Sequence, residues 1–156
     1  MRELIRSVRS HTHGRTSGPS EPDAVAELAL WASTADGVLD ETEVEELSAI
    51  LARIDGLAGF DAERARAIVN AMAAKYPSED AIAARILELA AHIHEPELRT
   101  RSYQLAIWSC ARDGQFSEEE AAFLENLQEA LELSDDEADA LLKATIEPVG
   151  GRSSTL

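Results

Sequence analysis

The chain has 156 residues, 45% of them hydrophobic and 4% aromatic, and its 30 acidic and 14 basic side chains give a net charge of −16. This length suits a single domain, and the charge argues against nucleic acid as a partner because nucleic-acid binders concentrate Lys and Arg on one face. One cysteine excludes an intrachain disulfide. No apolar run reaches membrane-spanning length and no secretory signal opens the chain, so we expect no transmembrane segment and a cytoplasmic location.

The N-terminal residues 1–21 differ in composition from the rest of the chain. They hold four arginines, Arg2, Arg6, Arg9 and Arg15, and become rich in Gly, Ser and Thr toward their end. We expect a short basic helix over Arg2–Arg9 followed by a flexible linker. Two interpretations stay open for this extension. One is a weak contact with anionic lipid or with the chain's own acidic body, and the other is a disordered tail.

Apolar residues recur at helical spacing from Pro22 to Ile146, and no segment alternates with period two for long enough to predict a strand. The pattern therefore predicts an all-α fold, a compact bundle of about seven helices over residues 22–146. A flexible tail over 147–156 is expected, with loop from Pro148. The residues expected to begin helices are Asp40, Asp61, Ser78, Pro96, Ser117 and Ser134.

A repeat appears when the chain is shifted by 77 residues. LALWASTADGVLDETEVEEL at 28–47 then aligns with LAIWSCARDGQFSEEEAAFL at 105–124, and the shared pattern is Trp-x4-Asp-Gly-x3-Glu-x-Glu. Duplication is the simplest explanation. We expect two helix–turn–helix repeats packed about a pseudo-twofold axis, with both tryptophans, Trp31 and Trp108, in the core.

The two Asp-Gly turns resemble the second half of an EF-hand calcium loop, in which an acid precedes a glycine and a glutamate follows six residues after it. The first half of that loop is absent, because Ala32 and Thr34 occupy the positions of its other carboxylates. Oxygen ligands of this kind favour a cation of the calcium or magnesium class. The candidate metal ligands are Asp36, Asp40, Glu43, Asp113 and Glu120.

Helix capping is the competing explanation for these acids. Asp40-x-x-Glu43 and Ser117-x-x-Glu120 both match a capping box, and so does Ser134-x-x-Glu137, which no Asp-Gly precedes. Capping leaves the aspartate before each glycine unexplained, since a negative charge at a helix C-terminus opposes the helix dipole. The sequence leaves open whether these turns bind metal or only cap helices.

These segments, together with ENLQEALELSDDEADALL at 125–142, resemble the TerB-like family of tellurite-resistance-associated helical domains. The sequence departs from the pattern of this family at two positions. Arg112 stands in place of a small residue before Asp113, and Glu132 stands in place of the usual glycine. The resemblance implies a non-enzymatic helical domain whose acidic turns bind a divalent metal ion. It also implies protein partners in cytoplasmic stress-response complexes associated with the membrane. Because Arg112 neighbours Asp113, we expect the first copy to be the better metal site.

Two other functions remain as alternatives. The first is an acidic structural adaptor that binds a basic protein partner without metal, and the second is a small hydrolase that uses carboxylates. No P-loop, nucleophile elbow or zinc-protease motif supports catalysis, so the chain is expected not to be an enzyme. His92 and His94 are two residues apart, a spacing that points them to different faces of a helix, so they are not expected to chelate one ion.

Overall fold

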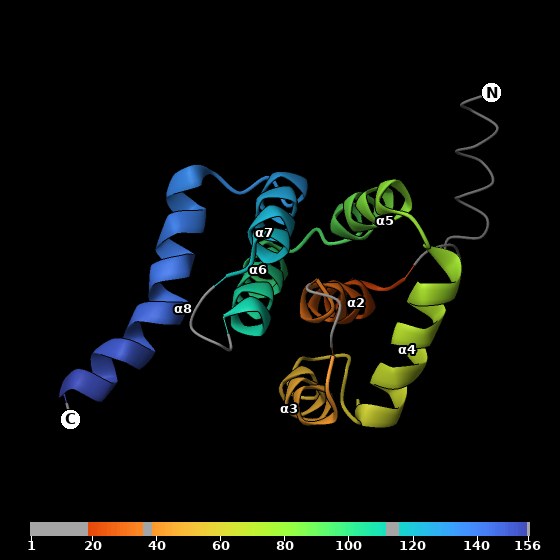
Figure 1. Ribbon diagram of the computed structural model, residues 1–156, viewed down its shortest axis with the longest axis horizontal. Coiled ribbons are helices and arrows are strands. Elements are labelled where there is room, and N and C mark those ends of the chain that lie inside the picture. Colours follow the sequence, from red (N-terminus) through yellow and green to blue (C-terminus); the bar gives the residue numbers. More distant parts are fainter. Residues whose placement is uncertain (1–18, 36–38, 112–115, 156) are drawn as a thin grey trace.

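A computed structural model describes residues 19–35, 39–111 and 116–155, with side chains described up to residue 145. Within these ranges every regular element is a helix, which confirms the predicted all-α class (Figure 1). The predicted basic helix over residues 2–9 lies outside the described residues. The described residues form seven helices: α2 (Glu21–Ser33), α3 (Glu41–Leu51), α4 (Ala62–Lys75), α5 (Glu79–Ala91), α6 (Pro96–Cys110), α7 (Glu118–Ala130) and α8 (Asp135–Thr155).

Side-chain caps begin most of these helices where the sequence predicts. The Asp61 carboxylate accepts from the backbone N–H of Arg64 at the start of α4, at 2.9 Å, and the Ser78 hydroxyl accepts from the N–H of Ala81 at the start of α5, at 3.1 Å. Each cap satisfies one of the N–H groups that a helix N-terminus leaves without an intrahelical acceptor. Pro96 stands at the first position of α6, as expected for a residue without an N–H.

Helix α2 forms the centre of the bundle. Figure 1 shows it with α3, α4, α5 and α6 around it, and it packs against α3, α4, α5, α6 and α7. Its small residues Ala24 and Ala29 are fully buried, as is Leu28 between them. Small side chains let the neighbouring helices approach closely, which explains how an alanine-rich chain with few aromatics builds a continuous core.

The turn between α7 and α8 explains why one of the departures from the family pattern matters. Glu132 has a φ of 61°, the left-handed conformation that glycine adopts most easily. The N–H of Leu133 donates to the carbonyl oxygen of Gln128 and that of Glu132 to the carbonyl oxygen of Glu129, both at 3.0 Å. This is the hydrogen-bond pattern of a Schellman C-cap, whose left-handed position Glu132 occupies.

Helix α8 corrects one prediction about the end of the chain. Its backbone continues through Pro148 to Thr155, whereas the sequence predicted a loop from Pro148. That prediction followed from the poor helix propensity of proline and of the two glycines after it. Proline removes one backbone donor and its ring crowds the carbonyl one turn earlier, and here the helix continues past it. The flexibility expected of residues 147–156 stays a prediction.

Candidate functional site

The first Asp-Gly turn leads from α2 into α3. Asp36 lies outside the described residues, which stop at Ala35 and resume at Leu39. Asp40 is the N-cap of α3. Its Oδ1 accepts from the N–H of Glu43 at 2.8 Å, and Glu43 Oε1 accepts from the N–H of Asp40 at 3.2 Å. The predicted capping box is therefore present, and it fixes the carboxylates of Asp40 and Glu43 in the first turn of α3.

The second Asp-Gly turn leads from α6 into α7, and Asp113 also lies outside the described residues. The Ser117 hydroxyl accepts from the N–H of Glu120 at 3.1 Å, and Glu120 Oε1 accepts from the N–H of Ser117 at 2.8 Å. Ser134 and Glu137 form a third capping box, with bonds of 3.0 and 2.8 Å, that follows no Asp-Gly pair. Capping alone is thus sufficient to explain why Glu43 and Glu120 stand where they do.

The C-terminal ends of α2 and α6, which precede the two turns, are in direct contact. The hydroxyl of Ser33 donates to that of Ser109 at 3.1 Å, and the thiol of Cys110 lies 3.9 Å from the carbonyl oxygen of Ala32. Cys110 is buried in this contact, where it packs as a small apolar side chain. The chain therefore enters both Asp-Gly segments from the same end of the α2–α6 pair.

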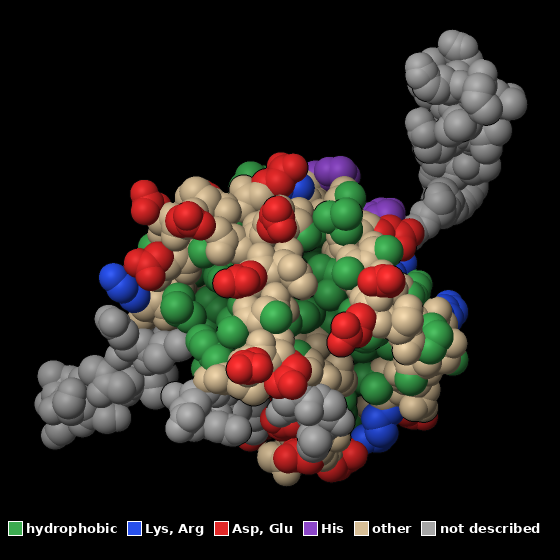
Figure 2. Space-filling model, turned by 45° about the horizontal axis from the view of Figure 1, so that its top comes forward, with side chains coloured by type: hydrophobic (Ala, Val, Ile, Leu, Met, Phe, Trp, Pro, Cys, Tyr) green, Lys and Arg blue, Asp and Glu red, His purple; other side chains and the backbone are tan. Residues whose placement is uncertain are grey.

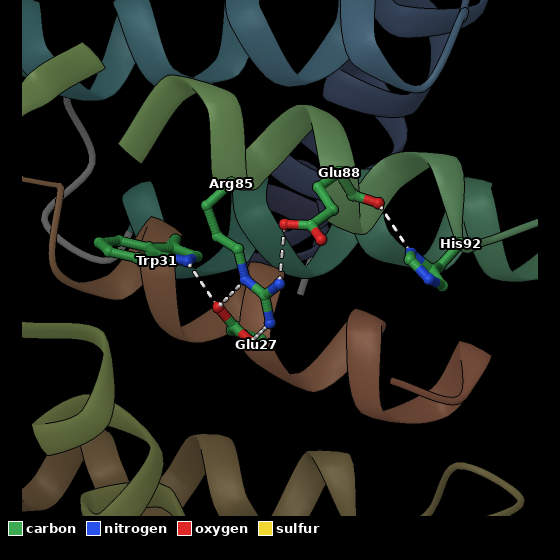
Figure 3. Close-up of polar contacts among 5 residues, drawn as sticks. All are labelled: Glu27, Trp31, Arg85, Glu88 and His92. Carbon is green, nitrogen blue, oxygen red and sulfur yellow. Dashed lines mark hydrogen bonds and ion pairs between the residues drawn. The ribbon is translucent and has the colours of Figure 1, made fainter. Parts of the chain in front are cut away.

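A partly buried ion pair, which sequence reasoning missed, joins α2 to α5 (Figure 3). The guanidinium of Arg85 donates to both carboxylate oxygens of Glu27, at 2.9 and 2.8 Å, and their side chains are 15% and 13% exposed. The indole N–H of Trp31 donates to the same carboxylate at 3.1 Å, and the third guanidinium nitrogen, Nη1, donates to Glu88 at 3.0 Å. The signal in the sequence was Glu27 itself, the single charge between Asp23 and Asp36.

Aromatic rings complete this cluster. Arg85 lies over the ring of Tyr76, 5.3 Å from its centroid, and Tyr76 meets Trp31 edge to face at 6.1 Å. The hydrogen bonds that Arg85 donates to Glu27, which outweigh the opposing effect of burial, raise the pKa of Arg85 further above its ordinary high value, so the guanidinium stays charged. Trp31 is 7% exposed, as predicted for a core residue, whereas Trp108 is half-buried against the core. The cluster fixes Trp31 and α5 at one wall of the bundle.

Among the described residues, no group of three or more His, Cys, Asp or Glu side chains is arranged to hold a metal ion. His92 ends α5, where its Nδ1 lies 2.9 Å from the carbonyl oxygen of Glu88, and the backbone N–H of His94 donates to Glu21 at 3.1 Å. Both contacts stabilise the connection between α5 and α6. No helix of the described chain is long and apolar enough to span a membrane.

Comparison with known proteins gives one family. The family model described as Tellurite resistance protein TerB matches residues 22–143, which include nearly all of α2, all of α3 to α7 and the first part of α8. No curated protein and no solved structure matches the chain. The matched segment covers both Asp-Gly turns and the helices on either side of them. Because the match extends over most of the sequence, the chain belongs to the TerB family.

Proposed function

We propose that this chain is a non-enzymatic interaction module that binds a divalent cation at its Asp-Gly turns and works in a cytoplasmic stress-response complex. The observation that carries the proposal is the contact between Ser33 and Ser109. Asp36 follows Ser33 by three residues and Asp113 follows Ser109 by four. At about 3.5 Å of chain per residue, covalent connection alone keeps each aspartate within roughly 14 Å of that contact.

The contacts between α2 and α6 support the proposed internal repeat. Under the 77-residue shift, Ala32 corresponds to Ser109 and Ser33 to Cys110. Ser33 contacts Ser109, and Cys110 contacts Ala32. The two contacts are therefore equivalent: in each, the second residue of the aligned pair in one copy meets the first residue of that pair in the other copy. Such reciprocal pairs are what a twofold axis generates. We therefore propose that the two turns flank an approximate twofold axis and that their acids serve one cation site or two adjacent ones.

The capping boxes supply the geometry of the remaining candidate ligands. Each of Asp40, Glu43 and Glu120 uses one carboxylate oxygen to accept a backbone N–H, which holds the carboxylate at the start of its helix. A carboxylate fixed in this way enters a metal site with little rotational entropy left to lose. Calcium takes six to eight oxygen ligands, so aspartates from both turns, backbone carbonyls and water would have to complete the shell.

A cation would also relieve the electrostatic cost of the turns. Two carboxylates about 4 Å apart repel each other by roughly 1 kcal/mol in water and by more where solvent is partly excluded. The chain carries a net charge of −16, so its field attracts cations in general. The second candidate, an acidic adaptor without metal, is favoured by the three capping boxes, because they account for the glutamates with no ion present.

Thermal melting with Mg²⁺, Ca²⁺, Mn²⁺ and Zn²⁺ separates the two candidates, because an ion that binds only the native state raises its stability. The informative variants keep the caps but remove charge: Asp40→Asn, Glu43→Gln and Glu120→Gln. Asp61→Asn is the matched control, since Asp61 caps α4 outside the turns. We expect the cation-induced shift in Tm to shrink in the three variants and in Asp36→Asn and Asp113→Asn, but not in the control. Equal shifts in all of them would favour the metal-free adaptor.

A further inference from the structure

An apolar groove of about 490 Å³ lies between α5, α7 and the C-terminal end of α2. Trp31, Ile82, Ile86 and Phe123 are the large apolar residues of its lining. Figure 2 shows hydrophobic side chains along a hollow in this face of the molecule, with acidic side chains at its borders. The Glu27–Arg85 pair holds α5 and Trp31 in place, so the groove is a fixed feature of the fold.

Acidic side chains stand at the borders of the groove. Glu79 and Asp80 come from the first turn of α5, and Glu119 comes from the first turn of α7. The lining, as far as the described residues form it, includes no Lys or Arg. An apolar floor with an acidic border matches a basic amphipathic helix, whose apolar face would fill the groove while its cations meet the carboxylates.

The apolar surface continues beyond the groove along α5. Leu87 is the one large hydrophobic side chain that the described residues leave exposed, at 60%. It follows Ala83, which lines the groove, by one helical turn. Ala83, Ile86 and Leu87 therefore form an apolar strip on α5 that extends from the groove toward the C-terminal end of the helix.

Residues 1–9 have the composition that this surface fits. Written as a helix, they place four apolar residues at i, i+3, i+4 and i+7, beside a row of arginines at i, i+4 and i+7. The apolar residues are Met1, Leu4, Ile5 and Val8, and the arginines are Arg2, Arg6 and Arg9. Eight helical residues are about 12 Å long, close to the roughly 10 Å from Glu79 to Ile86 on α5.

The connection from α2 lets this segment reach the groove. Glu21, the first residue of α2, accepts from the N–H groups of His94 and Glu95, both at 3.1 Å, so α2 begins beside the C-terminal end of α5. Leu87 is then about 10 Å away along α5. Residues 10–18 span up to about 30 Å when extended, which is more than enough.

We propose that residues 2–9 fold on docking into the groove between α5 and α7 of their own chain. Ile5 and Val8 cover the apolar strip that ends at Leu87, and the arginines lie against Glu79, Asp80 and Glu119. A free eight-residue helix is unstable, so the groove supplies the packing that orders the segment. The short linker makes docking intramolecular, with an effective concentration in the millimolar range. This contact does not depend on the proposed cation site.

The test measures the accessibility of the groove in the full-length chain, without added metal and with EDTA. Leu87→Cys in a Cys110→Ala background carries one thiol, which reacts with N-ethylmaleimide when the groove is open. We expect its labelling to be at least about fivefold slower than in the same protein with Arg2→Glu and Arg6→Glu, because a segment docked four-fifths of the time leaves one-fifth of the molecules reactive. High salt should remove the protection. Equal labelling rates in the two proteins would overturn the proposal.

A disulfide-trapping experiment identifies which chain supplies the segment. Ile5→Cys is paired with Leu87→Cys or with Ala67→Cys, an exposed control position on α4, again in the Cys110→Ala background. In dilute protein we expect the Ile5→Cys/Leu87→Cys variant to form its disulfide within one chain and faster than the Ile5→Cys/Ala67→Cys variant. Equal rates for the two variants, or disulfides that form only between two chains, would contradict docking within the same chain.

Discussion

Removal of Arg85 tests whether the Glu27–Arg85 pair fixes α5 to α2. Arg85→Met leaves the carboxylate of Glu27, 13% exposed, with the indole N–H of Trp31 but without its cation. Loss of one partner of a fully buried ion pair costs about 3–5 kcal/mol, and partial exposure reduces this to about 2–3 kcal/mol here. For a chain of this size, that loss corresponds to a fall in Tm of about 4–12 °C.

Glu27→Gln should be milder, because Arg85 keeps its hydrogen bond to Glu88 at 3.0 Å and the new amide oxygen still accepts from Trp31. The double variant, Glu27→Gln with Arg85→Met, buries no charge and should lose less than Arg85→Met alone. Urea unfolding followed by far-UV circular dichroism gives the free energies for this double-mutant cycle. If Arg85→Met loses less than about 1 kcal/mol, or if the two changes are simply additive, the pair does not hold these helices together as we describe.

Three further predictions concern stability. Glu132→Gly should stabilise the fold by about 0.5–1 kcal/mol, because glycine adopts the left-handed φ at the end of α7 without the strain that a side chain causes there. Glu132→Ala keeps that strain and should bring no gain in stability in a urea titration. Ser48→Ala should raise Tm, because the buried hydroxyl of Ser48 has no hydrogen-bond partner in the described structure. An unsatisfied buried polar group of this kind lowers the stability of the fold by about 1 kcal/mol or more. A lower Tm in the variant would show that the hydroxyl does have a hydrogen-bond partner. Burial raises the pKa of the Tyr103 phenol above 10.0, so the unfolded chain ionises at this tyrosine before the folded chain does. The stability that is present at lower pH is therefore lost as the pH rises past about 10. Tyr103→Phe should lose less stability than the parent between pH 9 and 11, and parallel curves of stability against pH for the two proteins would argue against this cause.

The local features of the fold were predictable from the sequence. Asp40, Asp61, Ser78 and Ser117 cap helices where the sequence places them, because an N-cap depends only on residues within one turn. The same local reasoning failed at Pro148, where it predicted a loop and the backbone stays helical.

The tertiary features were not predictable in this way. Glu27 and Arg85 are 58 residues apart, and nothing in a helical pattern says that they meet. The contact of Ser33 with Ser109 likewise depends on how α2 and α6 pack. Of the candidate metal ligands, the structure places Asp40, Glu43 and Glu120 in caps, while the positions of Asp36 and Asp113 stay a prediction.

Calorimetric titration of the full chain with Ca²⁺ and Mg²⁺ tests the proposed cation site most directly. Asp36 and Asp113 are the decisive residues, since no cap explains them. We expect saturable binding that is lost or strongly weakened in Asp36→Asn and Asp113→Asn, and that is unchanged in Asp61→Asn. If the parent shows no saturable binding, or if the two turn variants bind as the parent does, then the Asp-Gly turns are not the cation site that we propose.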